Sequence, residues 1–135
     1  MRQIARFVTA AVLLCAATAD LGATTCVWGK SFKVREVCGR VVDFQGALIP
    51  GAKIQVMRRD ESRPLAEGES DNNGNFYLAN VPNGTYVLRV QFAGFPDASQ
   101  LFKVVRPKTP GGCQQPIRVV MNTRCCYVEN AWKHK

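Results

Sequence analysis

The sequence predicts an all-β sandwich of seven strands. From Val37 onward, short runs of β-prone residues are separated by Gly, Pro, Asn and Asp at the spacing typical of such a fold. The run at residues 85–92 alternates fully between the two faces of a strand, with Tyr86, Leu88 and Val90 on one face. About 112 residues follow an N-terminal leader, which is the length of one domain.

The first 23 residues have the layout of a secretory signal peptide. Arg2 and Arg6 precede an apolar run at residues 7–19, and small residues follow this run. The run is shorter than the roughly 20 apolar residues that cross a bilayer, so we expect no transmembrane segment after cleavage. Cleavage is expected after Ala23, with Ala19 as the alternative. The protein is therefore predicted to be secreted, with a periplasmic or an extracellular location.

Three segments are expected behind the signal peptide at residues 1–23. They are a short N-terminal segment at residues 24–36, the β-sandwich at 37–122 and a basic, cysteine-containing C-terminal tail at 123–135. Turn signals such as Pro50-Gly51 and Asn83-Gly84 divide the sandwich into strands. The seven strands are expected at residues 37–43, 52–58, 65–70, 75–79, 85–92, 100–106 and 116–121.

The acidic and amide-rich stretch at residues 70–75 has two interpretations, a calcium loop or a turn. An EF-type calcium loop spreads its oxygen ligands over about twelve positions and closes with a glutamate, but the twelfth position from Asp71 is Pro82. The Asn-Gly pair in the stretch favours the positive φ angle of a tight hairpin turn. We therefore expect a hairpin rather than a metal site, with Phe76 and Leu78 facing inward in the next strand.

Three spaced motifs in the predicted sandwich agree with one another. They are Gly39-x-Val41-x-Asp43-x-x-Gly46-x-x-Ile49-Pro50-Gly51-Ala52-x-Ile54-x-Val56, Ser70-Asp71-x-x-Gly74-x-Phe76 and Val81-Pro82-x-Gly84-x-Tyr86-x-Leu88-x-Val90. With them, residues 37–121 resemble the carboxypeptidase regulatory-like domain. The resemblance implies a seven-stranded, Greek-key-type, transthyretin-like (prealbumin-like) sandwich. Such domains are usually non-catalytic accessory or structural modules of secreted and cell-surface proteins, in a superfamily that includes starch-binding domains. All matched positions are turn or core positions, so no functional residue is carried over.

The chain is predicted not to be an enzyme, with no catalytic, cofactor-binding or metal-binding residue. Two kinds of enzyme with similar sandwiches, hydroxyisourate hydrolases and intradiol dioxygenases, depend on several histidines. The sequence holds one histidine, His134, next to the C-terminus. This histidine is also the only one that could serve as base for a nucleophilic hydrolase. A zinc site is disfavoured as well, because no Cys-x-x-Cys pair is present.

Several cysteines behind an export signal predict disulfide bonds. Cys15 leaves with the leader, and the five that remain allow at most two bridges within one chain. The sequence leaves their pairing open. We expect the four cysteines at the two ends of the domain to join these ends and Cys113 to be unpaired; the four are Cys26, Cys38, Cys125 and Cys126.

The mature chain is predicted to be basic. The leader removes two of the 18 basic residues and one of the 10 acidic residues, which leaves a net charge of +7. Such an excess promotes association with anionic surfaces and polymers without identifying one of them. Export from the cytoplasm argues against a nucleic acid. The basic candidates are Lys103, Arg106, Lys108 and the tail residues Lys133 and Lys135.

Three functions are compatible with a secreted, non-enzymatic sandwich. The first is protein interaction or scaffolding in the cell envelope or the extracellular space, through a sheet edge or an unpaired thiol, with an unknown protein partner. The alternative is a carbohydrate-binding module that stacks a polysaccharide on outward aromatic rings, with Tyr77, Phe95 and Trp132 as candidates. The second alternative is electrostatic binding of anionic polymers.

Overall fold

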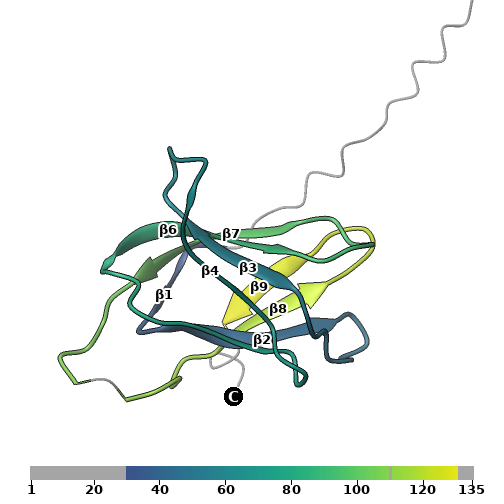
Figure 1. Ribbon diagram of the computed structural model, residues 1–135, viewed down its shortest axis with the longest axis horizontal. Helices are drawn as coiled ribbons and strands as arrows, with labels where there is room; N and C mark the ends of the chain where they lie inside the picture. The colour runs from purple at the N-terminus through teal and green to yellow at the C-terminus, as the bar shows by residue number, and fades with distance from the viewer. Residues whose placement is uncertain (1–29, 110, 131–135) are drawn as a thin grey trace, which may run out of the picture.

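The computed structural model describes residues 30–109 and 111–130, which form two β-sheets packed face to face (Figure 1). The five-stranded sheet has the order β1-β7-β6-β3-β4, and the four-stranded sheet has the order β5-β2-β8-β9. The predicted leader and Cys26 lie outside the described residues, as do Trp132 and His134. No described helix is long and apolar enough to span a membrane. The strands are β1 Phe32–Val34, β2 Val37–Asp43, β3 Lys53–Met57, β4 Pro64–Glu69, β5 Asn75–Leu78, β6 Gly84–Gln91, β7 Ala98–Val104, β8 Ile117–Met121 and β9 Tyr127–Asn130.

The all-β sandwich is confirmed, but the predicted number of seven strands is too low for the described residues. Strands β2 to β8 are the seven expected ones, and each ends within two residues of its predicted bounds. Strands β1 and β9 lie in the segments that were expected only to flank the sandwich. Strand β1 pairs in parallel with the distant β7, and β9 pairs with β8. Both strands are short and depend on partners that local alternation does not reveal.

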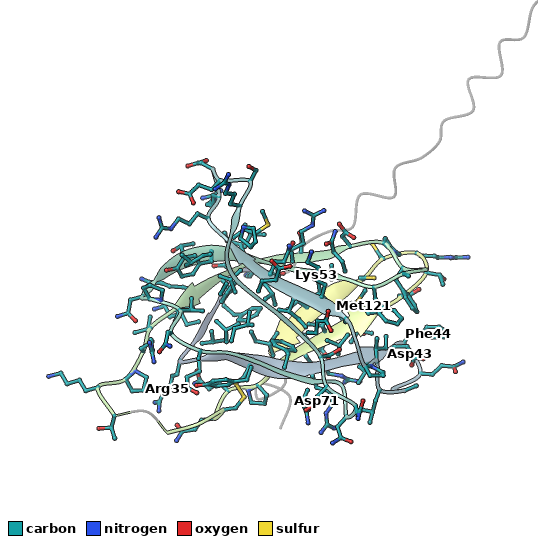
Figure 2. The ribbon with its side chains drawn as sticks, viewed as in Figure 1. Arg35, Asp43, Phe44, Lys53, Asp71 and Met121 are labelled. Carbon is teal, nitrogen blue, oxygen red and sulfur yellow. A yellow bond between two sulfur atoms is a disulfide. The ribbon has the colours of Figure 1, made fainter. Side chains whose placement is uncertain are left out.

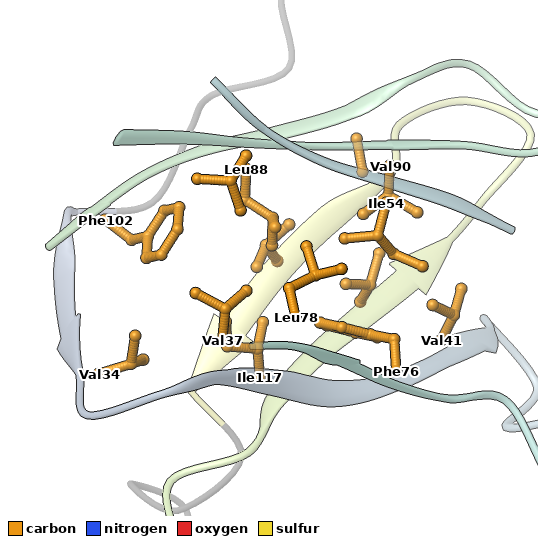
Figure 3. Packing of buried hydrophobic residues seen from close by; sticks show 14 of the residues in the cluster. Val34, Val37, Val41, Ile54, Phe76, Leu78, Leu88, Val90, Phe102 and Ile117 are labelled. Atoms are coloured by element: carbon orange, nitrogen blue, oxygen red, sulfur yellow. The ribbon is translucent and has the colours of Figure 1, made fainter. Parts of the chain in front are cut away.

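The hydrophobic core fills the space between the two sheets. Alternate residues of each strand face it, since successive side chains of a strand point to opposite faces. Val41 and Ile117 come from the four-stranded sheet, while Ile54, Leu88 and Phe102 come from the other, and all five are fully buried (Figure 3). The inward positions predicted for Phe76 and Leu78 are also confirmed, at 5% and 7% exposure.

The stretch at residues 70–75 is a turn, but its flanking strands do not form a hairpin. An Asp71 carboxylate oxygen accepts hydrogen bonds from the backbone N–H groups of Asn73 and Asn75, both at 2.9 Å. Gly74 has a φ of 74°, and a Cβ there would lie 2.7 Å from the carbonyl oxygen of Val41. Strands β4 and β5 on either side belong to different sheets. The turn therefore carries the chain across the sandwich, and the carboxylate of Asp71 caps it.

Ser70 fixes the point at which the chain leaves the five-stranded sheet. Its buried hydroxyl donates a hydrogen bond to the carbonyl oxygen of Ile49 at 2.7 Å and accepts one from the N–H of Ala52 at 2.8 Å. The backbone N–H of Ser70 also donates to the carbonyl oxygen of Ala52 at 2.9 Å. These bonds tie the start of the crossing to the Ile49-Pro50-Gly51 turn, which explains why the two motifs occur together in the sequence.

Candidate functional site

A groove lies on the outer face of the four-stranded sheet. Its volume is about 800 Å³, and its floor is β2 with Cys38, Arg40 and Val42. The residues after Cys113 close one end, and the loop with Gly46 and Leu48 closes the other. The remaining lining comes from β5, β8 and the rim residues Glu69 and Asp71. We call this feature the outer groove.

Three parallel rows of side chains cross the sheet beneath the outer groove. Strand register places Tyr77 beside Cys38 in the first row and Leu48 beside Val42 in the third. The middle row is polar, with Asn75, Arg40, Arg118 and Glu129 in adjacent register. The third row continues into Val120 and Tyr127. The floor thus has a charged centre between two apolar sides.

The loop at residues 43–49 builds the apolar end of the outer groove. The Asp43 carboxylate accepts hydrogen bonds from the backbone N–H groups of Gln45 at 2.9 Å and Ala47 at 2.8 Å. With its polar groups satisfied in this way, the loop holds Phe44 and Leu48 outward, at 59% and 45% exposure. Figure 2 shows Asp43 and Phe44 together at one end of the sandwich.

Only one of the two central arginines has a carboxylate partner among the described residues. Arg118 forms an ion pair with Glu129 at 3.3 Å. Arg40 donates from its Nε to the amide oxygen of Asn75 at 2.9 Å, and no described carboxylate lies within ion-pair distance of it. Arg40 lines the outer groove, and no hydrogen bond or ion pair from its Nη groups to another described residue is present. Strand alternation could have placed Arg40 on this face, but not the presence of Arg118 beside it.

The prediction that Cys113 is unpaired and that Cys126 forms a bridge is wrong. Cys38 and Cys113 form a disulfide with a Cα–Cα distance of 5.9 Å, at the end of the outer groove. The parallel pairing of β2 with β8 places Gly39 beside Ile117, which brings the segment before β8 next to Cys38. Cys125 is also disulfide-bonded. Cys126 faces inward and is a free, buried cysteine.

The buried thiol of Cys126 is held in the core rather than poised for reaction. It donates to the carbonyl oxygen of Pro96 at 2.8 Å. Burial raises its pKa, a backbone hydrogen bond from Asn122 partly offsets this, and the negative charge of Asp97 raises it further. The thiolate is the reactive species, so a raised pKa lowers reactivity at neutral pH.

We therefore expect Cys126 to resist alkylation in the folded protein. Native protein treated with iodoacetamide at neutral pH should yield an unlabelled Cys126 peptide in mass spectrometry, while protein unfolded in denaturant without reductant should yield a labelled one. Labelling of the native form should begin only as the pH rises above the ordinary thiol range, because the folded-state pKa is raised. Free cysteine in the same tube controls for the reagent, and rapid native labelling at neutral pH would contradict the buried placement.

A second group with a shifted pKa, Asp97, directly precedes the first residue of β7. Burial alone would raise the pKa of Asp97, but hydrogen bonds from Arg89 and Gln91 and the charge of Arg89 outweigh it, so the pKa is lowered. The Arg89 to Asp97 ion pair measures 2.8 Å. Ser99, two residues after Asp97, is the register partner of Arg89, so the Arg89 to Asp97 ion pair links β6 and β7 at one end of their pairing. No cluster of three or more metal-ligating side chains occurs within residues 30–109 and 111–130.

Of the three candidate stacking aromatics, Tyr77 and Phe95 are described, and they do not share a site. Tyr77 is confirmed as outward, at 54% exposure, and it lines the outer groove. Phe95 instead packs against Phe92, with 6.1 Å between the ring centroids, and is partly buried against the hydrophobic core. Trp132 lies outside the described residues. The basic candidate Lys103 projects from β7 in the other sheet, away from the outer groove.

A model of the carboxypeptidase regulatory-like domain matches residues 36–111. The chain belongs to this family. The resemblance carried by the three sequence motifs is thus confirmed, and most of the outer groove's floor and β5 wall falls within the matched domain.

The fold of this carboxypeptidase regulatory-like domain is also found in a hydrolase. The structure of Klebsiella pneumoniae 5-hydroxyisourate hydrolase superposes with a TM-score of 0.53 at 15% sequence identity, covering 73% of this chain and 99% of that one. At this identity the similarity concerns the two-sheet, transthyretin-like fold alone. No curated protein gives a significant sequence match.

Proposed function

We propose that this protein is an exported, non-enzymatic interaction module that binds a segment of a partner protein in the outer groove. The outer groove carries the proposal: it is a mostly apolar hollow of about 800 Å³ on a sheet face, and Tyr77 and Leu48 in its lining are exposed. Mostly apolar concave sites with a few polar groups are the usual form of binding sites. The disulfide at one end and the capped loop at the other make the site rigid, which lowers the entropic cost of binding.

Both apolar sides of the outer groove support a protein ligand. Tyr77 on β5 and Leu48 on the 43–49 loop present large apolar surfaces to solvent at opposite ends of the groove. Aromatic and aliphatic anchors of this kind, surrounded by polar residues, are typical of interaction hot spots. The family usually provides accessory and structural modules, which agrees with such a role.

Panning a displayed library of random linear peptides on the immobilised, oxidised protein tests this function. We expect enriched peptides to bind the unmodified protein and a Leu65→Asp control, and to lose binding to Tyr77→Asp. Leu65 is a fair control because it is an exposed apolar strand residue that does not line the outer groove. A library without enriched peptides, or peptides indifferent to Tyr77→Asp, would overturn the proposal.

Carbohydrate binding is the second candidate, and the exposed ring of Tyr77 on the groove wall favours it. Sugars stack on such rings, but Phe95 packs against the core and does not line the groove. Retention on immobilised neutral polysaccharides that persists at high salt and is lost in Tyr77→Ala would support this candidate. Retention that salt abolishes would indicate only the basic surface.

A further inference from the structure

The centre of the outer groove contains an arginine pair whose charge is only partly balanced. Arg40 and Arg118 are Cα partners in the parallel β2–β8 pair, and like charges in direct register destabilise a sheet. Glu129 balances Arg118 at 3.3 Å. Among the described residues, Arg40 is bound only by the neutral amide of Asn75, through Nε. Its two Nη groups can donate two parallel hydrogen bonds to the oxygens of a carboxylate in a bidentate pair.

The apolar positions on either side of Arg40 follow the repeat of an extended chain. Cys38, Arg40 and Val42 are successive outward residues of β2, about 6.6 to 6.8 Å apart along the strand. Tyr77 flanks the first of these positions, and Leu48 flanks the third. Cys38 and Val42 are themselves buried, so their exposed neighbours Tyr77 and Leu48 provide the apolar contacts. The outer groove therefore offers an apolar, a positive and a second apolar contact at about the spacing of every second residue in a peptide strand.

We propose that the outer groove recognises an extended acidic peptide segment of a partner protein, in which a glutamate or aspartate binds Arg40 and the second residue on each side is apolar. One apolar side chain rests on Tyr77 near the Cys38–Cys113 disulfide, and the other rests on Leu48, which lies beside the buried Val42. This inference rests on the proposed function and adds the chemistry of the ligand. An acidic polysaccharide fits less well, because the exposed Leu48 suits an aliphatic side chain better than sugar hydroxyls.

Fluorescence anisotropy with a defined peptide tests the inference. The probe is a labelled peptide with a central glutamate, a leucine at the second position on each side and serine at the other positions. The comparison peptide has glutamine in place of the glutamate. At about 0.15 M salt, where exposed charges are screened beyond about 8 Å, the unmodified protein should bind the glutamate peptide at least about tenfold more tightly. Arg40→Gln should remove this difference between the two peptides.

Arg59→Gln is the matched control. It removes the same charge from the exposed loop between β3 and β4, which does not line the outer groove. Its affinity for the glutamate peptide should equal that of the unmodified protein. Circular dichroism checks that Arg40→Gln is folded, and the comparison of the two peptides on the unmodified protein needs no variant.

Each contrary result points to a different error. Equal affinity for the two peptides, with both lost in Tyr77→Asp, would overturn the carboxylate assignment and leave the proposed function intact. An equal loss of affinity for the glutamate peptide in Arg40→Gln and Arg59→Gln would show an effect of net charge alone. This result would also overturn the carboxylate assignment. Binding of an oligouronate with the same dependence on Arg40, together with failure of every displayed peptide, would overturn both the inference and the proposed function.

Discussion

Replacing Phe102 by alanine should lower the free energy of unfolding by about 3–5 kcal/mol. Phe102 is fully buried in β7 and is the largest fully buried side chain among the described residues. Its ring contacts those of Phe32 and Tyr86, with centroids 6.3 Å and 6.1 Å away. The truncation therefore leaves a cavity at the point where β1, β6 and β7 meet (Figure 3). Urea unfolding followed by far-ultraviolet circular dichroism measures the change.

Phe44→Ala is the control for the Phe102 substitution. The same ring is removed, but at a position that is 59% exposed, where a surface substitution changes stability by about 0.5 kcal/mol or less. A loss of about 1 kcal/mol or less for Phe102→Ala would contradict an enclosed core position. Small domains have a total unfolding free energy of about 5–15 kcal/mol. Over most of this range Phe102→Ala should stay folded in the absence of urea, so that its unfolding transition can be measured.

The paired substitution Cys38→Ser with Cys113→Ser should cost about 2–4 kcal/mol of unfolding free energy. The two cysteines are 75 residues apart in sequence, so their bridge closes a long loop and restricts the unfolded chain strongly. Replacing both residues avoids leaving a thiol that would exchange with the disulfide of Cys125. Urea unfolding of the oxidised variant measures the loss. The slope of the transition should rise, because an uncrosslinked unfolded chain exposes more surface.

Reduction of the unmodified protein provides the comparison for this variant. Reductant opens the disulfide of Cys125 as well, so it should destabilise the protein more than the paired substitution does. Peptide mapping under non-reducing conditions should recover the Cys38 and Cys113 peptides joined. Separate recovery of these peptides, or unchanged stability of the variant, would contradict the observed pairing.

Strands β2 to β8 were predictable because their sequence signals are local. Strand β6 alternates along its length, Pro82 lies in the turn before it and Gly84 is its first residue, so a short window of sequence is enough to place it. Strands β1 and β9 were missed because they are only three and four residues long and gain their hydrogen bonds from β7 and β8. The turn at residues 70–75 was predicted from its Asn-Gly pair, but not its crossing between sheets.

The candidate site was predictable only in part. Tyr77 was placed outward by the parity of β5, and the structure confirms it. Arg40, Arg118 and the disulfide of Cys38 with Cys113 were not singled out. All of them depend on β8 lying in parallel beside β2, although more than 70 residues separate the two strands.

The sequence by itself determined the fold class, the family and the face of each central strand. It could do so because alternation with period two and turn chemistry act over a few residues. The tertiary structure alone decided which strands are neighbours, and with them the cysteine pairing, the arginine pair and the outer groove. Neighbouring strands are chosen by burial of the whole core between the sheets, and this long-range packing leaves no periodic mark in either strand.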